Sequence, residues 1–347
     1  MKRVSLLVFS FYLLVSLTSC KVEFSPNAEW RDVPVVYCVM DPEEDTVWVR
    51  VQRAFLSEDN MYQYTTVADS INYAEGQIAV HLLAWRNGQL LSRWNLTYTE
   101  VDGKPEGNFA GGIQPVFYCV PGEALRNDTD CVFQLVVLDS LSGDTMAQSR
   151  TSLVGFRPKV RMGNDSVEQV LISPSGSKGK EFGYRIGCRG EIKWYALPKG
   201  RRYQPILTFY YEKAGDTFAI RIPGTPRSDA DNANILNSYS ISQDRLLSYV
   251  KNALADNRDS LYTVNNVDIT IAVCNEDLNA YLNAQNAIAS LGTEAQPYTN
   301  IEGGLGVFAS RRSHIVVNVP CDSTGKPGYL PDELKNLHVG YYGDWGK

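Results

Sequence analysis

A cysteine near the N-terminus is the residue whose neighbours most clearly specify a chemical reaction. The segment Leu17–Cys20 follows a leader with a basic start, Lys2 and Arg3, and an apolar run over residues 4–15. This order is typical of a lipoprotein signal peptide that is removed before the cysteine. The thiol of Cys20 would then carry diacylglycerol, and its freed amine would take a further acyl chain. We therefore predict a signal peptide over 1–19 and a lipid-anchored linker over 20–31.

Several acyl chains on Cys20 would hold the protein on a membrane, because each buried methylene contributes roughly 0.8 kcal/mol. The apolar run of the leader is itself too short to cross a bilayer, which takes about 20 apolar residues. The sequence leaves open which face of the membrane the anchored chain occupies. Removal of the leader takes the formal charge from −6 to −8, without any basic block, so a nucleic-acid partner is not expected.

Elsewhere the sequence contains no pattern typical of a catalytic or metal site. The three histidines, His81, His314 and His338, have no second ligand at metal-binding spacing, and no G-x-S-x-G motif occurs. The run Gly303–Gly306 lacks the G-K-[ST] ending of a phosphate loop and precedes strand residues. We expect these glycines to permit close backbone packing, and we expect a protein without catalytic activity, metal or cofactor.

Six cysteines follow the lipidated one, in a compartment that permits disulfides. Cys119 and Cys131 flank a turn-rich segment and could form a disulfide across a hairpin, or stay free. Cys38, Cys188 and Cys274 lie in apolar runs, where cysteine most often acts as a small buried hydrophobe.

Aromatic and polar side chains in two segments could form a binding surface. These residues are Trp48, Arg50, Gln52, Tyr341, Tyr342 and Trp345. In the first segment the three side chains alternate with valines, which places them on the outer face of a strand. Trp48 could contact carbohydrate or protein there, or be covered by a second domain. The Gly-rich tail around Tyr341 leaves partner binding and simple packing equally open.

The elements that must position these residues are mostly β-strands. Short β-type runs over 32–155 predict an immunoglobulin-like or transthyretin-like β-sandwich domain. The expected strands are Val33–Met40, Thr46–Phe55, Gln77–Trp85, Leu90–Tyr98, Pro115–Val120, Cys131–Leu138 and Met146–Val154. Asn87-Gly88 predicts a type I′ hairpin turn.

A second domain with mixed α+β character is expected over 156–320, because the chain is long for one core. Its helices are expected from Ser242 to Leu254 and from a cap at Asp277 to Ala289. Its expected strands are Glu191–Leu197, Tyr203–Tyr211, Phe218–Ile222, Asn266–Cys274, Gly306–Ser310 and His314–Val319. The tail over 321–347 is expected to be irregular.

Four segments resemble one known family. Val35–Tyr37 leading into Asp41, then Val49–Val51 and Ala54–Leu56, are similar to a family of Bacteroidota outer-membrane lipoproteins of unassigned function. Asn300–Phe308 resembles the N-(I/V)-x-G-G-x-G-(V/I)-F segment near the end of that family's domain. The resemblance implies an outer-membrane lipoprotein with an N-terminal β-sandwich, encoded near TonB-dependent transporters, and it supplies no catalytic residues.

These observations favour a non-catalytic outer-membrane lipoprotein that serves as an accessory binding or assembly component, beside a TonB-dependent transporter. A structural subunit of surface fibres or an adhesin is one alternative, and a glycan-binding module is another. Six Asp-(Ser/Thr) sites followed by an aliphatic residue or methionine also resemble O-glycosylation sites of exported Bacteroides-type proteins; ordinary turn chemistry is the other interpretation. The acceptor residues are Thr46, Ser70, Ser140, Thr145, Ser166 and Ser260.

Overall fold

The computed structural model describes thirteen longer stretches of the chain and a few isolated positions. The described residues are 32–54, 71–104, 112–123, 128–155, 159–162, 165–168, 170–174, 190–213, 216–228, 236–241, 262–291, 298–320 and 339–340, with 245, 248–249 and 252–253. The expected signal peptide, Cys20 and the linker lie outside them, as do Cys188 and His338. Across these stretches the protein is mainly β, as expected from the sequence.

Apart from β4 and β5, the strands of the N-terminal half follow the expected runs closely. They are β1 Val33–Met40, β2 Val47–Ala54, β3 Ile78–Arg86, β4 Gln89–Asn95, β5 Thr97–Lys104, β6 Gly112–Cys119, β7 Val132–Asp139 and β8 Thr145–Ser152. The turn between β3 and β4 has positive φ angles at Asn87 (50°) and Gly88 (79°), which confirms the predicted hairpin turn.

The remaining elements include one helix. The strands are β9 Lys159–Met162, β10 Asp165–Glu168, β11 Val170–Pro174, β12 Gly190–Tyr195, β13 Arg202–Lys213, β14 Asp216–Pro223, β15 Arg227–Ser228, β16 Leu236–Ile241, β17 Tyr262–Cys274, β18 Leu305–Pro320 and β19 Val339–Gly340. The helix is α6, Glu276–Leu291. The other expected helix, Ser242–Leu254, falls mostly outside the described residues. No helix of the described stretches is long and apolar enough to cross a membrane.

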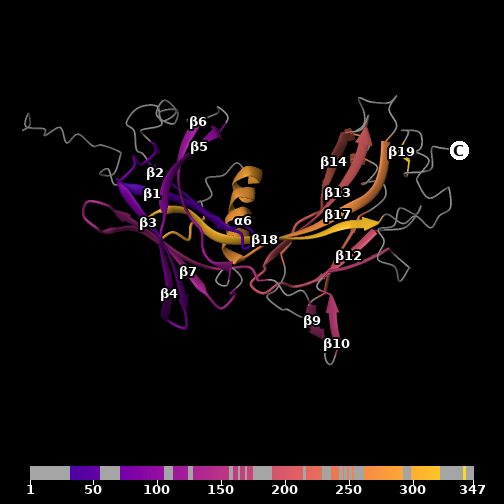
Figure 1. Cartoon of the computed structure of the whole chain (residues 1–347), viewed down its shortest axis with the longest axis horizontal. Coiled ribbons are helices and arrows are strands. Elements are labelled where there is room, and N and C mark those ends of the chain that lie inside the picture. The colour runs from indigo at the N-terminus through magenta and orange to yellow at the C-terminus, as the bar shows by residue number, and fades with distance from the viewer. Residues whose placement is uncertain are drawn as a thin grey trace, which may run out of the picture.

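Two sheets organise the N-terminal half. One is part of a ten-stranded sheet with the order β14-β13-β17-β18-β1-β2-β6-β5, to which β15 adds beside β13 and β19 beside β17. The other has the order β4-β3-β7-β8. The first sheet extends through the whole molecule, with its β17 and β13 end in the C-terminal half (Figure 1). A separate three-stranded sheet has the order β11-β12-β16.

One hydrophobic core lies between the two N-terminal sheets. In β2 the valines at 47, 49 and 51 are buried and alternate with more exposed residues, which is the period of a strand with one face in a core. The large sheet contributes buried side chains such as Val49 and Phe308, and the four-stranded sheet contributes Leu82 and Phe133. Each sheet therefore buries one face in this core, and this burial of apolar surface stabilises the packing of the two sheets.

The long strand β18 connects the two halves, and it corrects the prediction of two separate strands over Gly306–Ser310 and His314–Val319. Its first part pairs in parallel with β1, from Val35 opposite Leu305 to Met40 opposite Ser310. Its second part pairs antiparallel with β17, from Cys274 opposite Arg311 onward. The start of this strand, assigned from sequence to the second domain, thus lies in the first core through Phe308.

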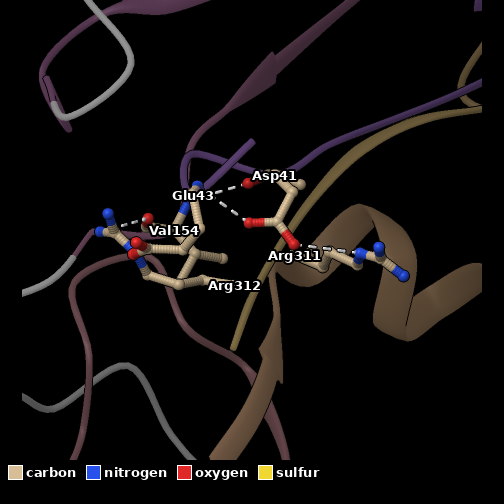
Figure 2. Close-up of polar contacts among 6 residues, drawn as sticks. Asp41, Glu43, Val154, Arg311 and Arg312 are labelled. Carbon is tan, nitrogen blue, oxygen red and sulfur yellow. Dashed lines mark hydrogen bonds and ion pairs between the residues drawn. The ribbon is translucent and has the colours of Figure 1, made fainter. Parts of the chain in front are cut away.

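Ion pairs hold β18 at the point where it changes partners. Arg312 is buried and its Nε donates to Glu43 Oε1 at 2.6 Å, while its Nη1 lies 3.4 Å from the carbonyl oxygen of Val154 (Figure 2). Its neighbour Arg311 is exposed and pairs with Asp41 at 3.2 Å. Two adjacent arginines would ordinarily favour a loop. Here both guanidinium groups are paired with carboxylates, so Arg311 and Arg312 can continue the strand.

A second correction concerns the expected strand Leu90–Tyr98. The structure divides it into β4 and β5, which belong to different sheets. The chain crosses at Leu96, whose N–H donates to the carbonyl of Val80 at 2.9 Å. Leu96 packs against the core, so the crossover buries an apolar side chain instead of showing the Gly, Pro or Asn of an ordinary turn.

The glycine run at the start of β18 permits close packing, as the sequence predicted. A Cβ at Gly303 would overlap the carbonyl oxygen of Met146, and one at Gly306 would overlap that of Val36. Gly303 and Gly306 also have φ angles of 76° and 108°, in a region that residues with a Cβ rarely adopt.

The hairpin disulfide that the sequence left open is absent from the structure, because Cys119 and Cys131 are free thiols. Cys119 ends β6 in the large sheet, opposite Val47, whereas Cys131 precedes β7 in the four-stranded sheet. Both are buried, as are Cys38 and Cys274, and burial raises the pKa of the Cys274 thiol to about 11. The Cys274 thiol is therefore protonated at neutral pH, and all four cysteines serve as small apolar core residues.

Candidate functional site

The outer face of β1, β2 and β6 carries a group of partly exposed aromatic and polar side chains. We call this group the aromatic face; its members are Tyr37, Val39, Trp48, Arg50, Gln52 and Tyr118. The strand registers bring them together: Tyr37 is opposite Arg50, and Trp48 is opposite Tyr118. Side chains paired in this way share one face of a sheet, so three strands separated in sequence contribute to one surface.

Trp48 is the most exposed ring of this face. Its side chain is 49% exposed, and its ring centroid lies 5.3 Å from that of Tyr118, with the planes tilted by 37°. Tyr37 and Val39 are 39% and 37% exposed. A close, tilted pair of rings with exposed neighbours is a surface on which a partner could bury apolar area without displacing the core.

Polar groups beside the rings can fix the orientation of a partner. Arg50 donates from Nη2 to Oε1 of Gln114, which holds the guanidinium beside the rings. Burial lowers the pKa of Arg50 from its ordinary value, although an arginine stays charged at any physiological pH. Gln52 donates to Oδ1 of Asn72 at 3.3 Å. The face therefore combines flat rings with one fixed positive charge and amides.

Helix α6 borders the aromatic face without covering it among the described residues. It packs on β18, the strand next to β1. A hydrogen bond with Tyr37 helps to raise the pKa of Tyr281 in this helix, although burial is the larger cause. The sequence left open whether the second domain covers Trp48. In the structure, α6 reaches only the margin of the aromatic face, and Trp48 stays half exposed.

The other sequence-predicted site residues are spread over the chain. Tyr341, Tyr342 and Trp345 lie outside the described residues, as do Ser70 and Ser260. Ser140 and Thr145 are exposed at the turn between β7 and β8, and Thr46 is half-buried at the start of β2. Ser166 lies in β10. In the β7–β8 turn, Asp139 Oδ1 accepts hydrogen bonds from the N–H groups of Leu141 and Ser142, which is the turn chemistry that the alternative interpretation expected.

A separate polar hollow lies where β8, the turn before β13 and the start of α6 meet. Its volume is about 390 Å³, within the usual size range of small-molecule pockets. It is lined by Val132, Arg150, Thr151, Ser152, Lys199, Gly200, Arg201, Asn275, Glu276 and Asp277. The sequence did not predict this hollow, because its wall comes from segments far apart in the chain.

The N-terminal cap of α6 forms one wall of this hollow, and it corrects the cap predicted at Asp277. Asn275 is the cap, since its Oδ1 accepts from the N–H of Leu278 at 3.2 Å. Its Nδ2 donates to Thr151 Oγ1 at 2.7 Å, and Thr151 Oγ1 donates to Asp277 Oδ2 at 2.8 Å. Burial raises the pKa of Asp277, while hydrogen bonds from Thr151, Asn300 and Asn275 oppose that shift.

No described group of three or more histidine, cysteine or acidic side chains is placed to hold a metal ion. Burial and the charge of Arg93 lower the pKa of His81, so this side chain is neutral at pH 7. Comparison with known proteins found no family model and no curated protein that matches the chain. The aromatic face and the polar hollow of the described residues are the basis of the functional proposals.

Proposed function

We propose that this protein is a non-catalytic lipoprotein of the outer membrane that binds a partner protein through the aromatic face. In this proposal acyl chains on Cys20 anchor the chain, and the partner is an envelope component such as a TonB-dependent transporter. We further propose that the two packed N-terminal sheets form an immunoglobulin-like or transthyretin-like sandwich that serves as a rigid support for the face.

The observation that supports binding is the half-exposed Trp48 in contact with the tilted ring of Tyr118 and flanked by Arg50. Tryptophan, tyrosine and arginine are the residues most enriched at the energetic centres of protein interfaces. A rigid sheet that presents them in fixed positions loses little conformational entropy on binding. The expected partner therefore offers an apolar surface with an acceptor for the guanidinium.

The test is purification from detergent-solubilised membranes of cells that carry the tagged, full-length protein. The wild type should recover a β-barrel partner, and Trp48→Ala should lose most of it, because truncation of an interface tryptophan commonly costs about 2 kcal/mol or more. Phe218→Ala is the matched control, since Phe218 is a ring of similar exposure on the distant strand β14. Repeated recovery of the wild-type lipoprotein alone would contradict the proposal.

The anchor is tested separately from the face. Cys20→Ser removes the thiol that takes diacylglycerol, so the variant should leave the membrane fraction or retain its leader. A wild type that keeps an intact leader, or a variant that fractionates as before, would refute the anchored part of the proposal. The binding part would still be decided by the purification with Trp48→Ala.

A glycan-binding module is the second candidate, and the same pair of rings favours it. Sugar rings bind to flat aromatic surfaces beside hydrogen-bond donors, which Arg50 and Gln52 would supply. Retention of the wild type on a polysaccharide gel, lost in Trp48→Ala and kept in Phe218→Ala, would favour this function over protein binding.

A further inference from the structure

The polar hollow at the start of α6 is distinct from the aromatic face and shares no residue with it. It lies between the end of β8, the turn Leu197–Gly200 and the first turn of α6. Main-chain hydrogen bonds fix these walls: Gly155 N–H donates to Pro198 O at 2.8 Å, and Arg201 N–H donates to Cys274 O at 2.7 Å. The hollow is thus bounded by ordered backbone on all three sides.

Five charged side chains line the hollow, and three of them are already engaged. Arg201 Nε pairs with Glu276 Oε2 at 2.7 Å. Asp277 accepts from Thr151 Oγ1 at 2.8 Å and from Asn275 Nδ2 at 3.2 Å. Glu276 is thus neutralised by Arg201, whereas Asp277 keeps its charge and is held by neutral donors of the wall.

The two remaining charges are the cations Arg150 and Lys199. Arg150 is exposed, and its guanidinium reaches only the amide oxygen of Gln134 at 3.5 Å. Neither Arg150 nor Lys199 forms an ion pair with any acidic side chain of the described stretches. Three cations and two carboxylates give the lining a net charge of +1, which favours a negatively charged ligand.

The backbone at Lys199 gives an independent reason to assign a role to its side chain. The carbonyl of Leu197 accepts from Gly200 N–H at 2.9 Å, so Pro198 and Lys199 are the central residues of a turn. Lys199 has a φ of 61°, at the position where a turn with this proline favours glycine. A lysine there carries a conformational cost that glycine would avoid, which fits a role for its ammonium group.

We propose that the hollow binds a small organic anion, with its carboxylate or phosphate group between Arg150 and Lys199. The hydroxyl of Ser152 and the backbone of Gly200 line the same space and can bond to further polar atoms of the ligand. Val132, at the start of β7, supplies an apolar patch for its carbon atoms. The charge-assisted bonds to the two cations provide most of the affinity.

The test is calorimetric titration of the full-length protein in detergent, at low ionic strength, with inorganic phosphate and, separately, with succinate. Saturable one-site binding of at least one probe is expected, and the probe that binds identifies phosphate or carboxylate as the preferred group. Lys199→Gly and Arg150→Gln should each weaken that binding about tenfold or more, the loss of one charge-assisted hydrogen bond. Raised salt should weaken it as well.

Three controls distinguish anion binding in this hollow from a folding defect and from anion binding elsewhere on the protein. Lys199→Gly should leave the midpoint of urea unfolding unchanged or raised, since glycine suits the turn, so weaker binding would not reflect loss of folding. Arg221→Gln, at an exposed arginine on β14, and Trp48→Ala should both bind as the wild type does. Absence of saturable binding, full binding in both site variants, or loss of binding in Trp48→Ala would overturn the proposal.

Discussion

At the scale of single residues, the close contact between Gly306 and β1 is the most demanding feature of the structure. Gly306 has a φ of 108°, and a Cβ there would overlap the carbonyl oxygen of Val36. Gly306→Ala should therefore lower the free energy of unfolding by about 3–5 kcal/mol, because backbone cannot move as a side-chain tip can. Equilibrium urea denaturation of the two proteins measures the difference.

Gly76→Ala is the control for this substitution. Gly76 has a similar positive φ of 80°, but a Cβ there would meet nothing within 4 Å. Its cost should be limited to backbone strain, about 1–2 kcal/mol. Equal losses in the two variants would show that the close approach of β18 to β1 contributes nothing beyond strain.

Residue-level properties that follow from local pattern could be predicted from the sequence. The place of Trp48 on the outer face of its strand follows from its alternation with valines, whereas its exposure depends on what packs over that face. The role of Gly303–Gly306 follows from glycine chemistry before a strand. The state of Cys119 and Cys131 could not be predicted in this way. It depends on which sheet each cysteine joins, and strand pairing between distant segments is not encoded in the spacing of two cysteines.

At the scale of elements, the start of α6 depends on one buried amide. Asn275 is 4% exposed, caps the helix and donates to Thr151, so Asn275→Ala removes the cap and leaves Thr151 without a donor. We expect a loss of about 2–3 kcal/mol, which is more than a surface cap alone contributes. Urea unfolding followed by circular dichroism in the helical region measures it.

Asn286→Ala provides the matched substitution in the same helix. Asn286 is exposed in the middle of α6, where alanine has the better helix propensity. This variant should be as stable as the wild type or slightly more stable. If Asn275→Ala lay within about 0.5 kcal/mol of Asn286→Ala, a figure typical of surface changes, the cap would not be what fixes the start of α6.

Element boundaries were predictable where turn-forming residues mark them and were wrong where burial overrides composition. Asn87-Gly88 marks a turn by its own chemistry, so the hairpin was predicted correctly. The division between β4 and β5 lies at Leu96, and the basic pair at 311–312 lies within β18. In both places a tertiary contact decides the conformation: core packing of Leu96 and the ion pair of Arg312.

At the scale of the whole molecule, both candidate sites arise from contacts between distant segments. The aromatic face could be predicted in part, because Trp48, Arg50 and Gln52 share one strand, whereas the addition of Tyr118 requires the pairing of β2 with β6. The polar hollow could not be predicted, since β8, the turn before β13 and α6 meet only after β18 has joined the two halves. A single strand thus determines how the halves share a sheet.

The ion pair between the buried Arg312 and the half-exposed Glu43, where β18 changes partners, should therefore matter for the stability of the whole chain. Arg312 is 4% exposed at its side chain and bonds to Glu43 and to the carbonyl of Val154 (Figure 2). Arg312→Gln leaves those acceptors without a charged donor and empties part of the packed space. We expect the free energy of urea unfolding to fall by about 2–4 kcal/mol.

The adjacent arginine separates burial from charge in this prediction. Arg311→Gln removes the same charge one residue away. The side chain of Arg311 is 59% exposed, although that of its partner Asp41 is only 9% exposed, so this substitution empties no packed space. Its cost should therefore be smaller than that of Arg312→Gln. If Arg311→Gln lowered the free energy of unfolding as much as Arg312→Gln does, the junction would be stabilised by positive charge beside the acidic turn before β2, and not by the burial of Arg312. A small loss in both would mean that main-chain pairing of β18 with β1 and β17 joins the halves without help from side chains.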